Sequence, residues 1–235
     1  MMVLGIETST PIASVALVSG AGLRGEITLN IGLTHSEQLL PLVDALLCQA
    51  RTRLDEVEGI AVAGGPGSFT GLRIGMATAK GLAQGRNIPL VGVPTLLALA
   101  HTQEGFNGLV SPVMNARKNE VYTALFRFGP KGAEQLAPYQ AASPRKWAEE
   151  LDRYSETVIM TGDGVEAYIN LWAEVLKEKA LFPPPVLRTA RAATIAWLGR
   201  NRFMEGYSDD LYGLKPLYIR PAEAEARLSG FKYLE

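Results

Sequence analysis

The chain has 235 residues, 47% of them hydrophobic, a net charge of −1 and a single cysteine, Cys48. Its length is sufficient for one large or two small domains with buried cores. The near-zero charge excludes a strong overall attraction to nucleic acid or anionic membranes, and leaves a local basic patch open. One cysteine excludes an internal disulfide and fits a reducing compartment. No secretory signal peptide and no membrane-spanning run of about 20 apolar residues is evident, so we expect a cytoplasmic protein.

The first half of the chain predicts three strands followed by alternating helices and strands. Apolar runs and turn residues give an antiparallel meander over residues 3–7, 13–18 and 23–30. Thr34 and Glu37 have the spacing of a capping box and start a helix that runs to about Ala50. Its apolar residues fall within an arc of about 160°, which is wider than packing on one sheet requires. A strand at 60–63, a helix at 72–84, a strand at 90–93 and a helix at 95–102 follow.

The second half repeats much of this order. We expect a hairpin of strands at 109–114 and 120–128, a weak third segment after 132, a helix at 144–153, a strand at 157–160, and helices at 165–179 and 192–204. The boundary is expected near Gly105–Gly108, which divides the chain into domains 1–106 and 107–235. Two halves of β-β-β-α-β-α order resemble the α/β actin-like ATPase (ribonuclease H-like) architecture. The polar tail after Pro221 is expected to be loosely held.

Residues 64–85 form a glycine-rich loop that leads into a helix with unusually small side chains. Ser68 or Thr70 is suited to cap this helix. One row of small residues consists of Gly71, Gly75 and Ala79, and a second row consists of Ala77, Gly81 and Gly85. Each interior glycine destabilises a helix by roughly 1 kcal/mol relative to alanine, so we expect a compensating close approach of another backbone.

Three interpretations of this loop and helix are open. The loop could cradle a phosphate at the helix N-terminus, but it lacks both the Lys-Ser/Thr ending of a P-loop and the G-x-G-x-x-G fingerprint. The small rows could instead form a tight interface with a partner chain, or they could pack within one domain. Spacing alone does not separate the last two.

Several motifs in order along the chain resemble the TsaB (YeaZ) family. They are Gly5-Ile6-Glu7-Thr8-Ser9, His35-Ser36-Glu37 with Leu39-Leu40-Pro41, Gly65-Pro66-Gly67-Ser68-Phe69-Thr70-Gly71-Leu72-Arg73-Ile74-Gly75, Ala116-Arg117 with Glu120-Val121-Tyr122, Gly162-Asp163-Gly164, and Pro216 with Tyr218-Ile219-Arg220-Pro221. The glycine block is the most specific of them. Asn115 stands where the family is expected to carry aspartate, and Lys118-Asn119 is also unusual there.

The resemblance implies a role in making N6-threonylcarbamoyladenosine beside the tRNA anticodon. Members of this family are non-catalytic relatives of the transferase TsaD, and they pair with TsaD and with a small ATPase, TsaE. The resemblance therefore implies an accessory subunit with tRNA as an indirect partner and no tightly bound cofactor. It allows ATP or ADP at the interface with the partner and implies a homodimer when the partner is absent.

The wide apolar arc and the small-residue rows motivate a partner interface made by the helices at 34–50 and 72–85. The candidate interface residues are Leu39, Leu40, Val43, Leu46, Leu47, Gly71, Gly75, Met76, Ala79 and Leu82. We expect a large residue at Gly75 or Ala79 to abolish partner binding while the monomer stays folded.

Two catalytic alternatives are weaker. A metal-dependent glycopeptidase-like hydrolase would use His-x-x-x-His, but Leu39 follows His35 by four residues and the only other histidine is His101, so we expect no metal site. A weak ATP-binding kinase of actin-like fold would use the turn formed by Glu7, Thr8, Ser9 and Thr10, which is a candidate nucleotide-binding site. A hydrolase nucleophile elbow, Gly-x-Ser-x-Gly, is absent.

Overall fold

Two five-stranded mixed sheets with the same strand order build the protein. The computed structural model describes residues 1–32 and 34–220, and the tail expected to be loosely held lies outside the described residues. The first sheet has the order β3-β2-β1-β4-β5, and the second has the matching order β8-β7-β6-β9-β10. In each sheet the three consecutive meander strands are antiparallel and the later strands are parallel to the first. This duplication confirms the predicted α/β actin-like fold.

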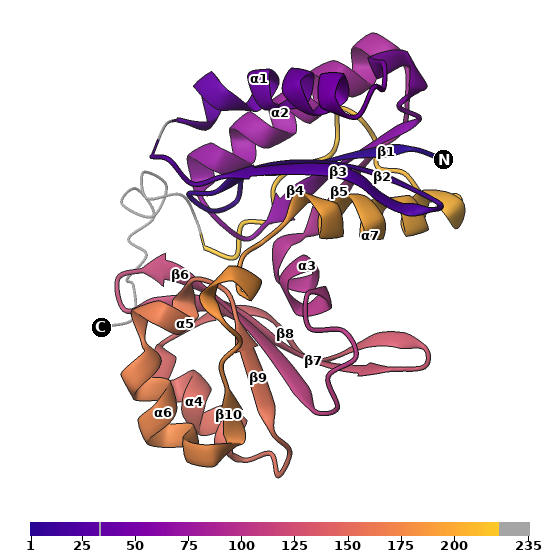
Figure 1. The fold of residues 1–235 in the computed structure, drawn as a ribbon. Helices are drawn as coiled ribbons and strands as arrows, with labels where there is room; N and C mark the ends of the chain where they lie inside the picture. Colours follow the sequence, from indigo (N-terminus) through magenta and orange to yellow (C-terminus); the bar gives the residue numbers. More distant parts are fainter. Residues whose placement is uncertain (33, 221–235) are drawn as a thin grey trace. The chain divides into compact units, whose positions relative to one another are not determined.

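The first unit comprises Met1–Ala98 together with Ala190–Leu217. Its elements, shown in Figure 1, are β1 (Val3–Glu7), β2 (Ala13–Ser19), β3 (Gly22–Leu29), α1 (His35–Gln49), the 3-10 helix η1 (Leu54–Glu56), β4 (Gly59–Gly65), α2 (Phe69–Arg86), β5 (Leu90–Pro94) and α7 (Ala192–Met204). Helix α3 (Thr95–His101) follows β5 and spans the change to the second unit along the chain.

The second unit comprises Leu99–Thr189 and, among the described C-terminal residues, 218–220. Its elements are β6 (Leu109–Arg117), β7 (Glu120–Gly129), β8 (Gly132–Ala142), α4 (Pro144–Asp152), β9 (Val158–Thr161), α5 (Gly164–Ala167), α6 (Ile169–Leu176), the 3-10 helix η2 (Lys177–Lys179), β10 (Ala180–Leu181) and the 3-10 helix η3 (Pro185–Leu187). Trp147 of α4 and Trp172 of α6 are fully buried in its core. The indole N–H of Trp147 donates to Ser111 Oγ, and that of Trp172 donates to the carbonyl oxygen of Gly164, so both polar groups are satisfied.

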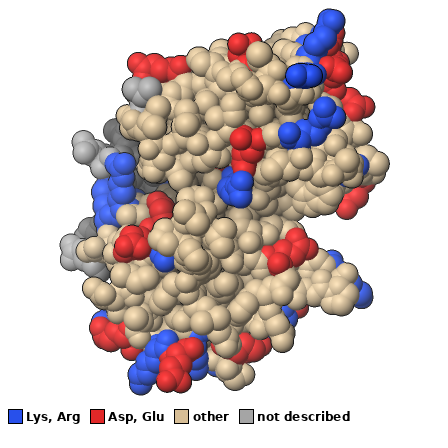
Figure 2. Space-filling view, viewed as in Figure 1, with Lys and Arg blue, Asp and Glu red and all other residues tan. Residues whose placement is uncertain are grey.

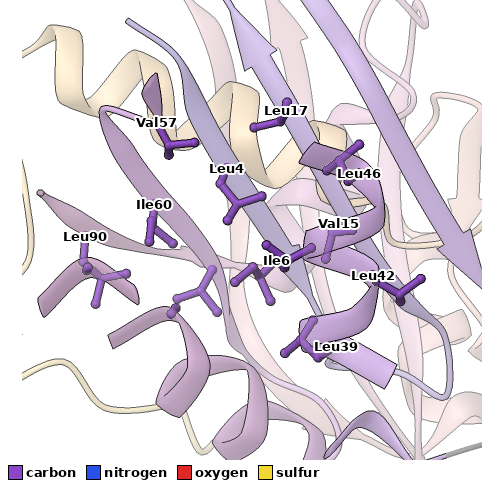
Figure 3. Packing of buried hydrophobic residues seen from close by; sticks show 14 of the residues in the cluster. Leu4, Ile6, Val15, Leu17, Leu39, Leu42, Leu46, Val57, Ile60 and Leu90 are labelled. Atoms are coloured by element: carbon purple, nitrogen blue, oxygen red, sulfur yellow. The ribbon is translucent and has the colours of Figure 1, made fainter. Parts of the chain in front are cut away.

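In the first unit, α1 and α2 lie side by side over one face of the sheet and α7 covers the other (Figure 1). The leucines of α1 pack on apolar residues of the strands, and Figure 3 shows Leu39, Leu42 and Leu46 in the same cluster as Ile6 and Val15. Full burial of each such side chain contributes roughly 2 kcal/mol relative to exposure. The apolar arc of α1 therefore serves mainly the core of its own unit.

Helix α7 packs so closely on its face that only glycine fits at two of the contacts. A Cβ at Gly5 of β1 would overlap the carbonyl oxygen of Ala192, and a Cβ at Gly199 of α7 would overlap the Cβ of Ala61. The segment after α7 then runs along the edge of β5. Asp209 N donates to the Leu90 carbonyl at 2.9 Å, and Gly92 N donates to Asp209 Oδ2 at 2.8 Å. These bonds cover an otherwise open sheet edge.

Four differences from the sequence expectations concern the division into units and the elements of the second half. The expected boundary at 106/107 assigned 192–204 to the second half, but α7 packs on the first sheet because Gly5 and Gly199 allow its close approach. The expected helix at 165–179 is interrupted at Tyr168, whose φ of −135° is not helical. The weak third segment is the 11-residue strand β8, which lies at a sheet edge and has few buried residues. The short strand β10 was not expected.

None of the helices in the described ranges combines the length and apolar character that crossing a bilayer would need. The surface is also mixed in charge. On the face drawn in Figure 2, basic and acidic side chains form small separate groups with wide uncharged areas between them. This distribution agrees with the net charge of −1 and shows no broad basic field on that face.

Candidate partner-binding face and the turn beneath it

The starts of α1 and α2 are both capped by side chains that the sequence pattern identifies. Thr34 N and Thr34 Oγ1 donate to Glu37 Oε2 at 3.3 and 2.6 Å, which completes the predicted capping box. The Thr34 side-chain hydrogen bond lowers the pKa of Glu37 below its usual value. Ser68, rather than Thr70, caps α2, since its Oγ accepts from Gly71 N at 3.2 Å. Helix α2 therefore begins three residues earlier than predicted.

The first row of small residues on α2 faces the interior. A Cβ at Gly71 would overlap the Thr8 carbonyl oxygen, and a Cβ at Gly75 would overlap Thr8 Oγ1. Thr8 Oγ1 donates to the Gly71 carbonyl at 2.8 Å, and Ala79 is fully buried. This row thus brings α2 against the turn that follows β1. For these three residues the interpretation as packing within one unit is correct.

The second row faces outward. Ala77, Gly81 and Gly85 are exposed, and a Cβ at Gly81 or Gly85 would meet no atom of the described residues within 4 Å. Helix α1 contributes Leu40, whose exposed fraction is 56%. We call the exposed residues of α1 and α2 from Leu40 onward the outer face. They are Leu40, Pro41, Asp44, Ala45, Cys48 and Gln49 of α1 and Phe69, Thr70, Arg73, Ala77, Gly81, Gln84, Gly85 and Arg86 of α2. Three of them carry a charge, Asp44, Arg73 and Arg86, and Arg86 is the last residue of α2.

Most of the predicted interface residues are buried in the unit's own core. The seven buried residues are Leu39, Val43, Leu46, Gly71, Gly75, Met76 and Ala79. Leu47 and Leu82 are half-buried, and Leu40 alone is exposed. The expectation that a large residue at Gly75 or Ala79 would leave the monomer folded is therefore wrong, because at Gly75 it would collide with Thr8 and at Ala79 no space is left.

The turn of Glu7, Thr8, Ser9 and Thr10 lies directly beneath the two helix starts. Ser68 N donates to the Ser9 carbonyl at 2.7 Å, and the His35 Nε2 atom lies 2.8 Å from the Thr10 carbonyl oxygen. The turn thereby fixes the first residues of both α1 and α2. Three motifs quoted for the family resemblance, far apart in sequence, converge at this point.

All four turn residues are covered, with exposed fractions of 0% for Glu7 and Thr8, 1% for Ser9 and 8% for Thr10. Ser9 N donates to Glu7 Oε1 at 2.5 Å, whereas Glu7 Oε2 and Ser9 Oγ are buried with no hydrogen-bond partner in residues 1–32 and 34–220. Burial raises the pKa of Glu7 to about 7, against the opposing effect of the hydrogen bond from Ser9 N. Nucleotide binding by these residues stays a prediction, and it would require the covering segments to move.

The second group of motifs converges in the other unit, around the β6–β7 hairpin. Asn115 N donates to Asp163 Oδ1 at 3.0 Å, and Arg117 N donates to Asn115 Oδ1 at 2.9 Å. Burial raises the pKa of Asp163. Arg220 forms an ion pair with Glu120, and both side chains are largely buried. Sequence reasoning quoted Glu120 and Arg220 in separate motifs but did not predict their pairing.

Each histidine has a polar partner: His35 Nε2 lies 2.8 Å from the Thr10 carbonyl oxygen, and His101 Nδ1 lies 3.0 Å from Glu104 Oε2. Across residues 1–32 and 34–220, His, Cys, Asp and Glu side chains form no group of three or more that could hold a metal ion.

Comparison with known proteins agrees with the motifs. Residues 30–227 match the family model described as TsaD, tRNA N6-adenosine threonylcarbamoyltransferase. The chain is 33% identical to the tRNA threonylcarbamoyladenosine biosynthesis protein TsaB of Bacillus subtilis, covering 97% of each chain. It is 31% identical to TsaB of Escherichia coli, covering 98% of this chain and 99% of that protein.

A solved structure shows the same fold. The protein from Pseudomonas aeruginosa described as similar to peptidase YeaZ superposes with a TM-score of 0.79 at 26% identity, covering 93% of this chain and 99% of that one. The chain matches its relatives over nearly their full length, not over a shared fragment. This chain therefore belongs to the TsaB family of tRNA threonylcarbamoyladenosine biosynthesis proteins.

Proposed function

We propose that this chain is a non-catalytic accessory subunit in the synthesis of N6-threonylcarbamoyladenosine in tRNA, and that it binds a TsaD-like transferase through the outer face. The observation that carries the proposal is the exposed row Ala77, Gly81 and Gly85 beside the exposed Leu40. Protein interfaces are poor in charge at their centre, and this face has three charged residues, Asp44, Arg73 and Arg86, the last of which lies at the end of α2.

The relationship to the TsaD family model supports the choice of partner. A related chain would carry helices in the positions of α1 and α2, and two such pairs of helices pack as a four-helix layer. The absence of side chains beyond Cα at Gly81 and Gly85 allows a partner helix to approach closely. A second copy of this chain fits the same face, so we expect a homodimer when the transferase is absent. A TsaE-like ATPase is expected to join the assembled pair, and tRNA is expected to be an indirect partner.

We expect no tightly bound nucleotide on the isolated chain, because Glu7, Thr8, Ser9 and Thr10 are covered by the starts of α1 and α2 and their neighbours. If ATP or ADP takes part, the proposal assigns it to the junction with the partner. A fluorescent ATP analogue titrated into the chain alone, and then into the complex with the transferase subunit, tests this point. Saturable micromolar binding to the isolated chain would contradict it.

Reconstitution tests the proposed function as a whole. Purified transferase subunit, TsaE-like ATPase, threonylcarbamoyl-adenylate, ATP and tRNA should give modified tRNA only when this chain is added. The chain alone, with or without added zinc or iron, should neither transfer the threonylcarbamoyl group nor hydrolyse peptides. Transfer by the isolated chain, or full activity without it, would refute the accessory role.

A further inference from the structure

One arginine of the first unit lacks the acceptor that comparable arginines have. Arg200 of α7 is half-buried, and its Nε atom is buried with no hydrogen-bond partner in residues 1–32 and 34–220. Each of the other half-buried arginines in these ranges binds an oxygen atom. The pairs are Arg127 with Glu156, Arg188 with Glu166, Arg202 with the carbonyl group of Gly92, and Arg220 with Glu120. Because a buried donor without an acceptor destabilises a protein, Arg200 needs a separate explanation.

The contacts of Arg200 orient its guanidinium group without supplying an oxygen atom. Its Cζ atom lies 5.8 Å from the centroid of the Trp197 ring, one helical turn earlier. A Cβ at Gly20, in the turn between β2 and β3, would lie 3.1 Å from Arg200 Nη2, so the guanidinium also packs against this glycine. An aromatic ring and a backbone turn therefore hold the charged group in place.

Two exposed apolar side chains flank Arg200 along α7. The exposed fractions are 40% for Trp197 and 62% for Met204. At 3.6 residues per turn, Trp197, Arg200 and Met204 fall within an arc of about 60°. Gly199, which packs on Ala61 of the sheet, lies outside this arc. We call Trp197, Arg200 and Met204 the α7 surface; it faces outward and places one cation between apolar side chains.

The chemistry of the α7 surface selects the class of ligand. A guanidinium group binds oxyanions, either carboxylate or phosphate. A polynucleotide needs several cations along its phosphates, whereas this surface has one guanidinium and the chain has a net charge of −1. Tryptophan and arginine are, in contrast, among the residue types that contribute most to binding between proteins. The ligand that fits is a carboxylate side chain on the surface of a protein partner.

We propose that the α7 surface binds a protein partner, with an Asp or Glu side chain of the partner on Arg200 and apolar side chains on Trp197 and Met204. Helix α7 covers the sheet face opposite to α1 and α2 (Figure 1), so this surface is separate from the one assigned to the transferase. The choice of partner rests on the proposed function, in which the TsaE-like ATPase is the remaining protein. Its carboxylate supplies the acceptor that Arg200 lacks among the described residues.

Arg200→Met tests the proposal, because it removes the guanidinium group and keeps an unbranched apolar side chain. The isolated variant should unfold within about 1 °C of wild type, since no acceptor is lost. The transferase should bind it normally. Calorimetric titration of the ATPase into this complex, with ATP present, should show at least tenfold weaker binding than in wild type. Arg200→Lys should fall between the two, because it keeps the charge without the fork.

Two controls separate this proposal from the proposed function. Arg153→Met removes an exposed arginine of the second unit and should bind the ATPase normally. Leu40→Asp in the outer face should weaken binding of the transferase. If Leu40→Asp has this effect and Arg200→Met has none, the present inference alone is refuted. If the wild-type chain binds neither protein, the proposed function is refuted and this inference with it.

Three further results would overturn the proposal. The first is wild-type affinity for the ATPase in both Arg200→Met and Trp197→Ala. The second is a fall of several degrees in the unfolding midpoint of isolated Arg200→Met, which would give Arg200 a role within the chain. The third comes from sedimentation of the chain alone. If Arg200→Met dissociates a dimer and leaves ATPase binding unchanged, the α7 surface binds a second copy and the assigned partner is wrong.

Discussion

The two rows of small residues on α2 have the same spacing and opposite roles. Gly71, Gly75 and Ala79 bring the helix against Thr8 and are part of the interior, whereas Ala77, Gly81 and Gly85 face outward with open space around the glycines. Among the described residues, only the inner row makes compensating contacts. The glycines of the outer row destabilise the helix, and no contact within the described residues offsets this loss. We therefore assign the outer row to contact with a partner.

The largest effect is expected in the inner row. Gly75→Leu should destabilise the protein by about 3 kcal/mol or more, because its side chain would have to displace Thr8 from beneath α2. Urea unfolding followed by circular dichroism measures the loss. Gly85→Leu in the outer row is the matched control and should not destabilise the fold. Equal losses in the two variants would remove the distinction between the rows.

A second large effect concerns the turn on which the inner row packs. The raised pKa of Glu7, about 7, means that the folded protein holds this proton more tightly than the unfolded chain. Its contribution to stability is present in full below the usual carboxyl pKa, about 4.5, and is lost as the pH rises through 7, which amounts to roughly 3 kcal/mol.

Glu7→Gln should remove this part of the pH dependence. The difference in unfolding free energy between wild-type protein and Glu7→Gln is measured from pH 4.5 to pH 8. The unfolding free energy of Glu7→Gln should increase relative to that of the wild-type protein as the pH rises. A difference that stays constant over this range would show that Glu7 ionises as freely in the folded protein as in the unfolded chain.

A substitution in the outer face should weaken binding to the partner and leave the stability of the fold unchanged. Leu40→Asp places a charge at a residue that is 56% exposed, so the unfolding midpoint should stay within about 1 °C of wild type. Affinity for the transferase subunit should fall about tenfold or more, because a charge would be desolvated in the interface. Glu149→Gln on the exposed side of α4 serves as the control. Unchanged affinity would place the interface elsewhere.

The smallest expected effect is a gain in the stability of the isolated chain. Gly81→Ala should stabilise the isolated chain by roughly 0.5–1 kcal/mol, since alanine is the better helix former and its Cβ meets no neighbour. Thermal unfolding at low protein concentration, where dimers are not populated, measures it. A loss of stability would mean that Gly81 already makes a contact within the monomer.

Much of the fold was predictable because its signals are local. The capping box at Thr34 and Glu37, the cap at Ser68 and the paired meanders all follow from short patterns, and the duplicated order of elements identified the actin-like architecture. The family was also predictable, since its motifs occur in order along nearly the whole chain. These features can be predicted without knowing the tertiary contacts.

The remainder depends on long-range contacts that spacing cannot specify. Helical periodicity did not separate the two rows of α2, since the difference lies in Thr8, more than 60 residues away. The boundary expected at 106/107 placed α7 in the wrong unit, because the contacts with Gly5 and Ala61 that hold it are distant in sequence. The apolar arc of α1 includes both the buried Leu39, Val43 and Leu46 and the exposed Leu40. The arc therefore could not show which of these residues are buried.

Calorimetric titration of a TsaD-like transferase subunit with Gly81→Leu tests the central claim most directly. Ala173→Leu, at an exposed residue of α6 in the other unit, is the control for an added surface leucine. Gly81→Leu should fold at least as stably as wild type and bind the transferase at least tenfold more weakly, while Ala173→Leu should bind normally. Wild-type affinity in Gly81→Leu, with its fold intact, would contradict the assignment of the outer face to a partner.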